Sequence, residues 1–543
     1  MGYATSHIQE LTSLQIEVAM KKQIDNSLSI NEQGQLCVEN YTADDLAREF
    51  GTPLYVISEQ QLRENARSFQ RAFGDCWPEG EVNILPAIKA NYTLALRYIL
   101  TEEGCGCDLF SEGELWAALE AGVDPAKTSL NGNSKVGFSN SLLETAIKHG
   151  VKITMDDASE FPLIEEIAKS LGKKAIVRIR LRPEYPALSE PTDFLVETIP
   201  TELATQIYKS GMPMEDVIPL GKKAIASKYV ELRGIHIHQG RHRRELKFWQ
   251  GTMQGLAAAL GQLKKEWAGW EPQEIDLGGG FPPPRDPTAR EVDRSAWFTT
   301  KLLSAGAKIG NLFNARNQVT QGFLNMGISD DEIGTNPLAD LAPTIDEYAQ
   351  VVTETLRKEL LKNGLTPQGK RLEIEPGRGL YGDTGIHLAK VTFIKRQKKP
   401  LILTWVNTDT TDSFLNDSVA EHSRFRYLLA NKPIDGLQKE EILTADLVGC
   451  SCNADRIIGN AQLPANVAQG DVVAFLDTGA YQDSSASNFN AIPRPATVLV
   501  SGNNAEVIKR RETYEDVFRR DLVPNRFKNE EKISKPSLEV QLG

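Results

Sequence analysis

A lysine stands directly after an apolar segment, in the run Leu85 to Asn91 with the sequence LPAIKAN. A buried ammonium group is costly unless it is paired or neutralised, so a lysine at the end of a strand needs a chemical reason. Condensation with an aldehyde to give an aldimine neutralises the amine. Lys89 is therefore the candidate for covalent attachment of a carbonyl compound.

Two glycine-containing segments are suited to binding an oxyanion. The run Gly278, Gly279 and Gly280 lets backbone N–H groups approach a ligand closely, because no side chain intervenes. The pair Gly377 and Arg378 adds a guanidinium group, whose donors form a fixed fork. Together the two segments predict a phosphate-binding site, provided that they lie on neighbouring strands.

Eight short apolar runs alternate with amphipathic helical stretches. They cover residues 82–89, 106–111, 128–132, 151–157, 175–181, 232–238, 274–280 and 371–377. Strands separated by helices indicate parallel βαβ units, and eight units predict an α/β fold with a closed (β/α)₈ barrel. Barrel enzymes carry their chemistry at the carboxyl ends of the strands. The polar and glycine residues at these ends are Lys89, Asp108, Ser111, Asn131, Asp156, Asp157, Arg180, His238, Gly278 to Gly280, Glu375, Gly377 and Arg378. The alternative is that polar residues simply mark where strands enter loops.

Around this barrel the sequence predicts three further parts and one insertion. Residues 1–35 form an N-terminal extension with a helix over 6–23, and the barrel domain covers 36–385, beginning with a strand at 36–38 and a helix at 44–50. A long insertion at 282–365 is expected to pack beside the barrel mouth. Residues 386–520 form an antiparallel β domain with a final helix over 510–518, and 521–543 form a tail. The expected strands of this domain are 390–394, 401–405, 446–450, 471–476 and 496–500.

The composition limits the classes of function. The 543 residues are 41% hydrophobic and 25% charged, and 61 Lys and Arg against 73 Asp and Glu give a net charge of −12. This balance argues against nucleic acid as a partner and favours a small molecule. Because the sequence has no run of eighteen apolar residues and no signal-peptide pattern, we expect a cytoplasmic protein without a membrane partner. A short match to a myristoylation motif at the N-terminus is readily produced by chance.

Six cysteines do not form the dense framework of a small secreted domain, so reduced thiols are expected. Cys105 with Cys107 and Cys450 with Cys452 form two Cys-x-Cys pairs that could in principle close a zinc site. Their spacing is unlike that of the usual zinc ligands, and the prediction is that no metal is bound.

Residues 35–520 resemble the pyridoxal-phosphate (PLP)-dependent decarboxylases of the alanine-racemase-like fold, which act on diaminopimelate, ornithine and arginine. The segments that carry the resemblance are Gly51 to Val56, Pro86 to Asn91, Gly106 to Leu115, Gly234 to Gly240, Asp276 to Gly280, Glu375 to Arg378, Gly479 to Tyr481, Phe489 to Asn490 and Arg511 to Asp516. Each motif alone is modest, but so many in one order are jointly specific.

The resemblance implies a role for each matching residue. Lys89 would carry PLP as an aldimine, His238 would stack on the pyridine ring, and Glu375 would keep the ring nitrogen protonated, so that the ring serves as an electron sink for decarboxylation. Cys452, donated by the partner subunit of a homodimer, would reprotonate the quinonoid. The remaining cofactor contacts implied are Asp108, Arg180, Gly278, Gly279, Gly280, Gly377, Arg378 and Tyr481, and the substrate contacts are Asn453, Asp412 and Tyr481.

Three departures from the family pattern bear on the substrate. Arg241 replaces a serine near the stacking histidine, and Asn453 replaces an acid in a cysteine loop that is one residue shorter, which leaves Cys450 as a rival proton donor. The segment 408–426 lacks the Arg-Pro-x-x-Tyr-like motif that binds the distal carboxylate of diaminopimelate. We therefore expect a diamino acid or related amino acid with a polar far end, with Asp409, Asp412 and Asp417 as possible partners for a distal amine.

The alternatives for the substrate are diaminopimelate itself and an N-substituted, for example citryl, diamino acid. Other classes of function also fit parts of the sequence. His236, His238 and His242 could serve a metal-dependent hydrolase, although His236 is more readily explained as a buried supporting residue. A PLP-dependent racemase would use the same cofactor, and a non-catalytic homologue would have no need of Lys89, Glu375 and the loop cysteine.

Overall fold

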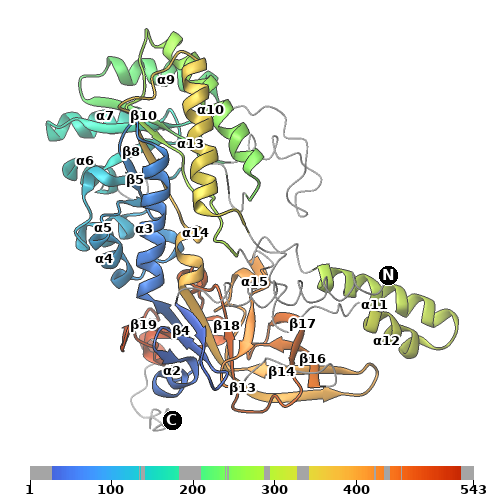
Figure 1. Cartoon of the computed structure of the whole chain (residues 1–543). Coiled ribbons are helices and arrows are strands. Elements are labelled where there is room, and N and C mark those ends of the chain that lie inside the picture. The colour runs from blue at the N-terminus through green and yellow to red at the C-terminus, as the bar shows by residue number, and fades with distance from the viewer. Residues whose placement is uncertain are drawn as a thin grey trace.

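The computed structural model describes residues 27–133, 135, 141–182, 209–238, 240, 244–285, 294–326, 342–420, 423–432, 441–453 and 455–527. Figure 1 shows a barrel domain above a sheet domain. The expected helix at 6–23, the tail from residue 528, and the residues Arg241 and His242 lie outside the described residues.

The barrel consists of eight parallel strands. They are β5 (Val82–Ile84), β6 (Cys107–Leu109), β7 (Thr128–Leu130), β8 (Lys152–Met155), β9 (Ala175–Arg180), β10 (Val230–His236), β11 (Glu274–Asp276) and β12 (Arg371–Ile374). The sheet order is β5-β12-β11-β10-β9-β8-β7-β6, and a parallel bridge between Ala87 and Asp108 joins its two ends. Each of the eight predicted runs contains or overlaps one strand, so the predicted barrel is confirmed.

Helices cover the outside of the barrel because each presents one apolar face to the strands. They are α3 (Glu59–Cys76), α4 (Leu94–Glu102), α5 (Glu112–Glu120), α6 (Ser141–His149), α7 (Glu160–Leu171), α9 (Met214–Ala226), α10 (Leu246–Glu266) and α13 (Ile345–Lys362). Ser111 and Glu114 form a capping box that fixes the start of α5. Trp249 of α10 stacks on Phe281 with 4.2 Å between ring centroids, which anchors the chain just after the glycine run.

The second domain is a nine-stranded, mostly antiparallel sheet, as expected. Its strands are β4 (Leu54–Ser58), β13 (Gly385–Gln397), β14 (Leu403–Thr408), β15 (Tyr427–Leu429), β16 (Ile442–Val448), β17 (Arg456–Pro464), β18 (Val472–Phe475), β19 (Ala496–Ser501) and β20 (Asn504–Lys509). The five predicted strands are present, whereas β15, β17 and β20 were not anticipated. The final helix is a single turn, α17 (Tyr514–Val517).

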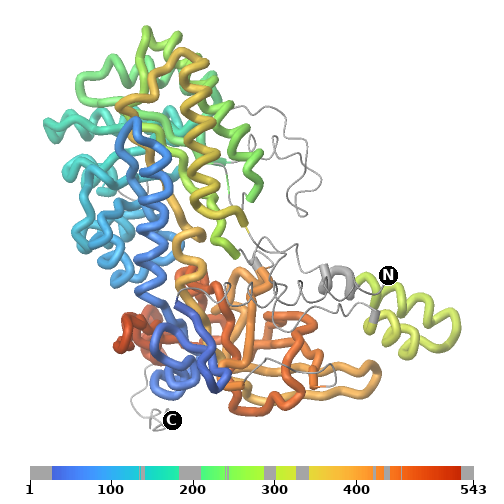
Figure 2. Tube along the Cα trace, viewed as in Figure 1, coloured from blue at the N-terminus to red at the C-terminus, as the bar shows by residue number. Residues whose placement is uncertain are grey.

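The strand β4 pairs with β13 and with β19, so a segment from the N-terminal part of the chain lies inside the second sheet. Figure 2 shows this blue strand beside the strands from the far end of the chain. The small sheet β1 (Leu28–Ile30), β2 (Leu36–Val38) and β3 (Tyr41–Thr42), with α2 (Ala43–Phe50), packs on the same domain. The range 36–385 is therefore not occupied by the barrel alone, because all five residues of β4 are buried in the second sheet.

The described helices of the insertion lie in two places. Helices α11 (Arg294–Leu312) and α12 (Arg316–Met326) form a hairpin that Figure 1 shows beside the second domain, with α11 against β17. Helix α13 instead packs on α10 and α3 at the outside of the barrel, through Tyr348, Val352 and Leu356. That the insertion as a whole packs beside the barrel mouth stays a prediction. None of the described helices is long and apolar enough to cross a membrane.

Candidate active site

A cavity of about 270 Å³ opens at the carboxyl ends of the barrel strands. Most of the predicted cofactor residues line it, together with residues of the second domain. The predicted residues that line it are Lys89, His238, Gly279, Gly280, Glu375, Gly377, Arg378 and Tyr481, and Asn416 and Asp417 join them from the second domain. The structure therefore brings these predicted residues together around one cavity, and residues of the second domain form part of its wall.

Lys89 lies in a 3₁₀ turn, Ile88–Ala90, shortly after β5. Its Nζ atom is 2.7 Å from Oδ2 of Asp108, whose side chain is buried at the end of β6. Burial disfavours the charged amine, but the carboxylate of Asp108, with Tyr481 and Glu375, raises the pKa of Lys89 above its ordinary value. In this structure the amine is thus a paired cation at the edge of the cavity.

A chain of hydrogen bonds leads from Lys89 to Glu375 across the barrel. Asn131, which follows β7, donates from Nδ2 to Oδ1 of Asp108 at 2.7 Å and to Oε1 of Glu375 at 2.6 Å. Glu375 follows β12 and is buried, and its burial and the neighbouring charge of Asp108 raise its pKa to about 7. The amide of Asn131 therefore holds the carboxyl groups of Asp108 and Glu375 at the same time.

His238 and the glycine run form one side of the cavity. The backbone N–H of Gly279 donates to Nδ1 of His238 at 3.1 Å. Gly280 has a φ of +107°, and a Cβ atom there would lie 2.6 Å from the carbonyl oxygen of Gly240. A Cβ atom at Gly279 would lie 2.4 Å from the carbonyl oxygen of Glu375. Only glycine fits these positions, and their bare backbone faces the cavity.

Arg378 begins the short helix α14 (Arg378–Tyr381) and is already paired. Its Nη1 atom lies 2.6 Å from Oδ2 of Asp417, and both side chains are buried. The guanidinium carbon lies 4.7 Å from the centroid of the Tyr481 ring. The sequence predicted Arg378 and Tyr481 at a phosphate site, but it gave no signal for the ion pair with Asp417.

Arg180 does not line the cavity. Its Nη1 atom lies 3.4 Å from Oδ1 of Asp156, at the ends of β9 and β8. Its predicted contact with the cofactor stays a prediction.

The described residues of the cysteine loop, 449–453 and 455, lie against residues that follow β14. Asn453 donates from Nδ2 to Asp412 at 2.6 Å, and the backbone N–H of Asp412 donates to Asp455 at 2.6 Å. Burial and the adjacent Asp455 raise the pKa of Asp412 to about 6. Cys450 and Cys452 are both exposed, and neither lines the cavity among the described residues. The two predicted substrate residues Asp412 and Asn453 are thus in contact with each other.

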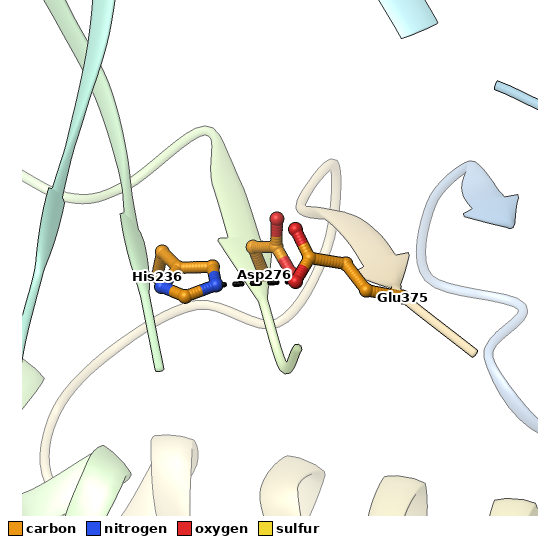
Figure 3. A group of neighbouring side chains, drawn as sticks. All are labelled: His236, Asp276 and Glu375. Carbon is orange, nitrogen blue, oxygen red and sulfur yellow. Dashed lines mark hydrogen bonds and ion pairs between the residues drawn. The ribbon is translucent and has the colours of Figure 1, made fainter. Parts of the chain in front are cut away.

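His236 and Asp276 are functional candidates that motif reading left without a defined role. Figure 3 shows both beside Glu375, and one ligand atom from each of the three lies within 4.8 Å of the others. Nε2 of His236 is 3.3 Å from Oε2 of Glu375, which agrees with its expected part as a buried supporting residue.

No ligand group that includes a cysteine occurs among the described residues, so the four-thiolate zinc alternative has no support.

These residues define a barrel enzyme with a lysine, a buried acid and a glycine–arginine cradle at its mouth, and the comparisons agree. Residues 59–316 match the family model of the pyridoxal-dependent decarboxylase pyridoxal-binding domain. Diaminopimelate decarboxylase of Methanocaldococcus jannaschii is 29% identical over 91% of this chain and 96% of that protein. The Bacillus subtilis diaminopimelate decarboxylase is 28% identical, with shares of 91% and 96%.

Solved structures give the same result. The crystal structure of the M. jannaschii diaminopimelate decarboxylase has a TM-score of 0.74 and 26% identity, and covers 93% of this chain and 99% of that one. Its complex with L-lysine has a TM-score of 0.73 and 27% identity, with shares of 92% and 99%. The chain is similar in sequence and in fold to PLP-dependent decarboxylases. It is a carboxy-lyase that uses pyridoxal phosphate.

The site fits this cofactor on its own geometry. Lys89 offers an amine. The glycine run offers backbone N–H donors that a Cβ atom would block, and Arg378 offers guanidinium donors that an apolar residue would lack. Glu375 offers a buried carboxyl group that has hydrogen-bond donors but no direct salt-bridge partner of fixed charge among the described residues. A protonated ring nitrogen is the kind of partner that such a group can accommodate.

Proposed function

We propose that the chain removes the α-carboxylate of a diamino acid, with Lys89 holding the cofactor covalently. The observation that carries this proposal is the chain of contacts from Lys89 through Asp108 and Asn131 to Glu375, at the edge of one cavity. It places an amine and a buried acid at two positions of the same site. Neither a metal-dependent hydrolase nor a non-catalytic homologue requires both.

Each residue has a definite task in this proposal. When bound, pyridoxal phosphate supplies an electron sink that makes loss of CO₂ from an α-amino acid possible. Glu375 would hold a proton at the ring nitrogen, and Asn131 orients its carboxyl group. His238 would present its ring to the cofactor, and Gly279, Gly280 and Arg378 would bind the phosphate.

Borohydride reduction followed by peptide mapping tests the assignment of Lys89. The pyridoxyl group is expected on the peptide that contains Lys89, and the Lys89→Ala variant should carry none. Lys152 is a useful internal control, because it is fully buried in the barrel and contacts Glu373. A label on any lysine other than Lys89 would overturn the assignment.

We further propose that Cys452 of one subunit completes the site of its partner in a homodimer. In support, the loop with Cys450 and Cys452 is exposed, and neither cysteine lines the cavity among the described residues. A cysteine that donates a proton to the substrate carbon would then have to come from a second chain. A cytoplasmic location stays a prediction.

Subunit mixing tests the shared site. Lys89→Ala and Cys452→Ala subunits are each expected to be inactive, and a mixture should regain activity because one of the two hybrid sites is intact. The Cys450→Ala subunit is the matched control: if Cys452 is the donor, this variant stays active by itself. No recovery despite proven subunit exchange would contradict the shared site.

For the substrate, the named relatives favour diaminopimelate, whereas one feature of the cavity favours an amino acid whose side chain has no second carboxylate. Asp417 lines the cavity and already pairs with Arg378, and Arg426 is held by Asp477 at 2.6 Å. The segment 408–426 lacks the Arg-Pro-x-x-Tyr-like motif, which favours a substrate without a distal carboxylate. A diamino acid that ends in an amine is thus the second candidate, with Asp417 and Asp412 as acceptors.

Values of kcat/KM decide between the two candidates. They are to be measured for meso-diaminopimelate, lysine, ornithine, arginine and a citryl-capped diamino acid. A pocket that lacks a partner for the second carboxylate should discriminate against diaminopimelate by more than about tenfold, or about 1.4 kcal/mol. A tenfold preference for diaminopimelate would show that this chain binds the distal carboxylate by residues other than the missing motif.

A further inference from the structure

Several strands of the barrel carry charged side chains that are fully buried. Lys152 of β8, Arg178 of β9, Asp276 of β11 and Glu373 of β12 are all fully buried. Lys152 and Arg178 both contact Glu373, so this one carboxylate lies between two cations. Ionised groups without partners are expensive in such surroundings, and the balance of charge therefore matters.

The charges around Glu375 and Asp276 do not balance if every carboxyl group is ionised. The ionisable groups that face this pair or its direct partners are Lys89, Asp108, Lys152, Arg178, Arg180, His236, Glu274, Glu373 and Arg371. Lys89 is matched by Asp108, Lys152 by Glu373, and Arg180 by Asp156 at 3.4 Å. Glu274 is matched by Arg371 at 2.9 Å. Only Arg178, which Glu373 shares, remains as a cation for both Asp276 and Glu375.

Neutral donors surround the rest of the pair. Asp276 accepts the backbone N–H of Gly278 on Oδ1 at 2.9 Å, and its Oδ2 lies 2.7 Å from Nη1 of Arg178. Burial, which outweighs the attraction of Asp276, lowers the pKa of His236 to about 3, so its ring is neutral beside Glu375. Burial and mutual repulsion raise the pKa of Asp276 far above its ordinary range.

The three side chains in Figure 3 are also of the types that bind metal ions. The guanidinium group of Arg178, however, lies at 2.7 Å from Asp276 and would repel a divalent cation there. A proton bound to one of the two carboxyl groups also neutralises the excess negative charge, and it places no divalent cation beside Arg178. Two adjacent buried carboxyl groups that share one proton titrate as a unit.

We propose that Asp276 is a positioning residue that shares one proton with Glu375, and that this proton is released to solvent when a protonated ring nitrogen takes its place against Glu375. The inference rests on the proposed role of Glu375. Charge is conserved in the exchange, because one positive ring replaces one proton at the carboxyl pair. Binding of the ring should therefore become tighter as the pH rises through the range in which the pair holds its proton.

The probe for this exchange is pyridoxine 5′-phosphate, which has the ring nitrogen and the phosphate but no aldehyde to react with Lys89. Its dissociation constant is measured from pH 6 to pH 8, and proton release is measured by calorimetry in buffers of different ionisation enthalpy. Ionisation of the free probe is the same for every variant and cancels when variants are compared. One released proton changes affinity by up to about tenfold for each pH unit.

Asp276→Asn is the decisive variant, because an asparagine oxygen still accepts the N–H of Gly278 but one of the two carboxyl groups that share the proton is gone. We expect wild type to gain affinity with pH relative to Asp276→Asn, and to release more protons on binding. The Asp276→Ala variant, which also loses the bond to Gly278, separates bracing of the glycine run from proton sharing. Equal pH slopes and equal proton release in wild type and Asp276→Asn would overturn the inference.

Glu375→Gln separates this inference from the proposed function. If Glu375→Gln loses the pH slope but Asp276→Asn keeps it, Asp276 has no part and the role of Glu375 stands. If Glu375→Gln itself behaves like wild type, the role of Glu375 has failed. Should Asp276→Asn not fold, infrared difference spectra of wild type give the answer, because the band of a protonated carboxyl group must disappear when the probe binds, and its persistence would refute the exchange.

Discussion

Replacing Glu375 by glutamine is expected to stabilise the cofactor-free protein at neutral pH while it impairs catalysis. The side chain is 5% exposed, and burial and Asp108 raise its pKa from 4.5 to about 7. A group whose pKa is higher in the folded state binds more protons there than in the unfolded state. Its ionisation therefore costs stability progressively between about pH 4.5 and pH 7, and the cost is constant above that range.

The size of this cost follows from the two pKa values. Each unit of difference between the two pKa values is about 1.4 kcal/mol, so ionisation of Glu375 lowers the free energy of unfolding by an amount on the order of 3 kcal/mol. Glutamine keeps an amide oxygen for Asn131 but has no charge to bury. For a chain of 543 residues this corresponds to a rise in melting temperature of about 2 to 3 °C at pH 7.5.

Differential scanning calorimetry of both proteins without cofactor, from pH 5 to pH 8, measures this directly. The two melting temperatures should nearly coincide at pH 5 and separate as the pH approaches 7. The same variant should lose at least about tenfold in decarboxylation rate, since an amide cannot pair with a charged ring nitrogen. Melting curves that separate by the same amount at pH 5 and at pH 7.5 would refute the reasoning, because the effect would then not come from ionisation.

Three further changes test other parts of the site. Gly280→Ala should abolish cofactor binding or folding, because its Cβ atom would meet the carbonyl oxygen of Gly240 at 2.6 Å, and absorbance of the purified protein reports the bound cofactor. Asp417→Asn should destabilise the cofactor-free protein by about 3 to 5 kcal/mol, because it leaves Arg378 buried without its ion pair, and added inorganic phosphate should recover part of the loss in thermal melts. Asn131→Ala should lower kcat more than it raises KM, because Asn131 holds Asp108 and Glu375 and does not line the cavity, and steady-state kinetics would show the split.

The sequence predicted the barrel well because its signals are local. Each strand is a short apolar run beside an amphipathic helix, and the polar residues at strand ends share one mouth once the barrel closes. Lys89, Glu375 and the glycine run could therefore be expected together. The position of β4 could not be predicted in this way, since its five buried residues would suit either sheet.

Pairings between remote residues account for the other omissions. Nothing in the spacing of Arg378 and Asp417 predicts that they form an ion pair, and the role of Asp276 depends on which charges lie inside the closed barrel. Such contacts depend on side-chain packing, for which a linear pattern carries no signal. The direction of the hairpin α11–α12 is likewise set by its contact with the second domain.

The position of β4 between β13 and β19 affects how the protein folds during synthesis and where the chain can be divided into fragments. Val56 pairs with Ile386 and with Val498, about 330 and about 440 residues later in the chain. During synthesis both edges of β4 therefore stay unpaired until nearly the whole chain has been made. The closure of so long a loop is slow. A fragment that begins at residue 386 would lack a central strand of its own sheet, so the second domain is not a module that can be exchanged by a cut at that boundary.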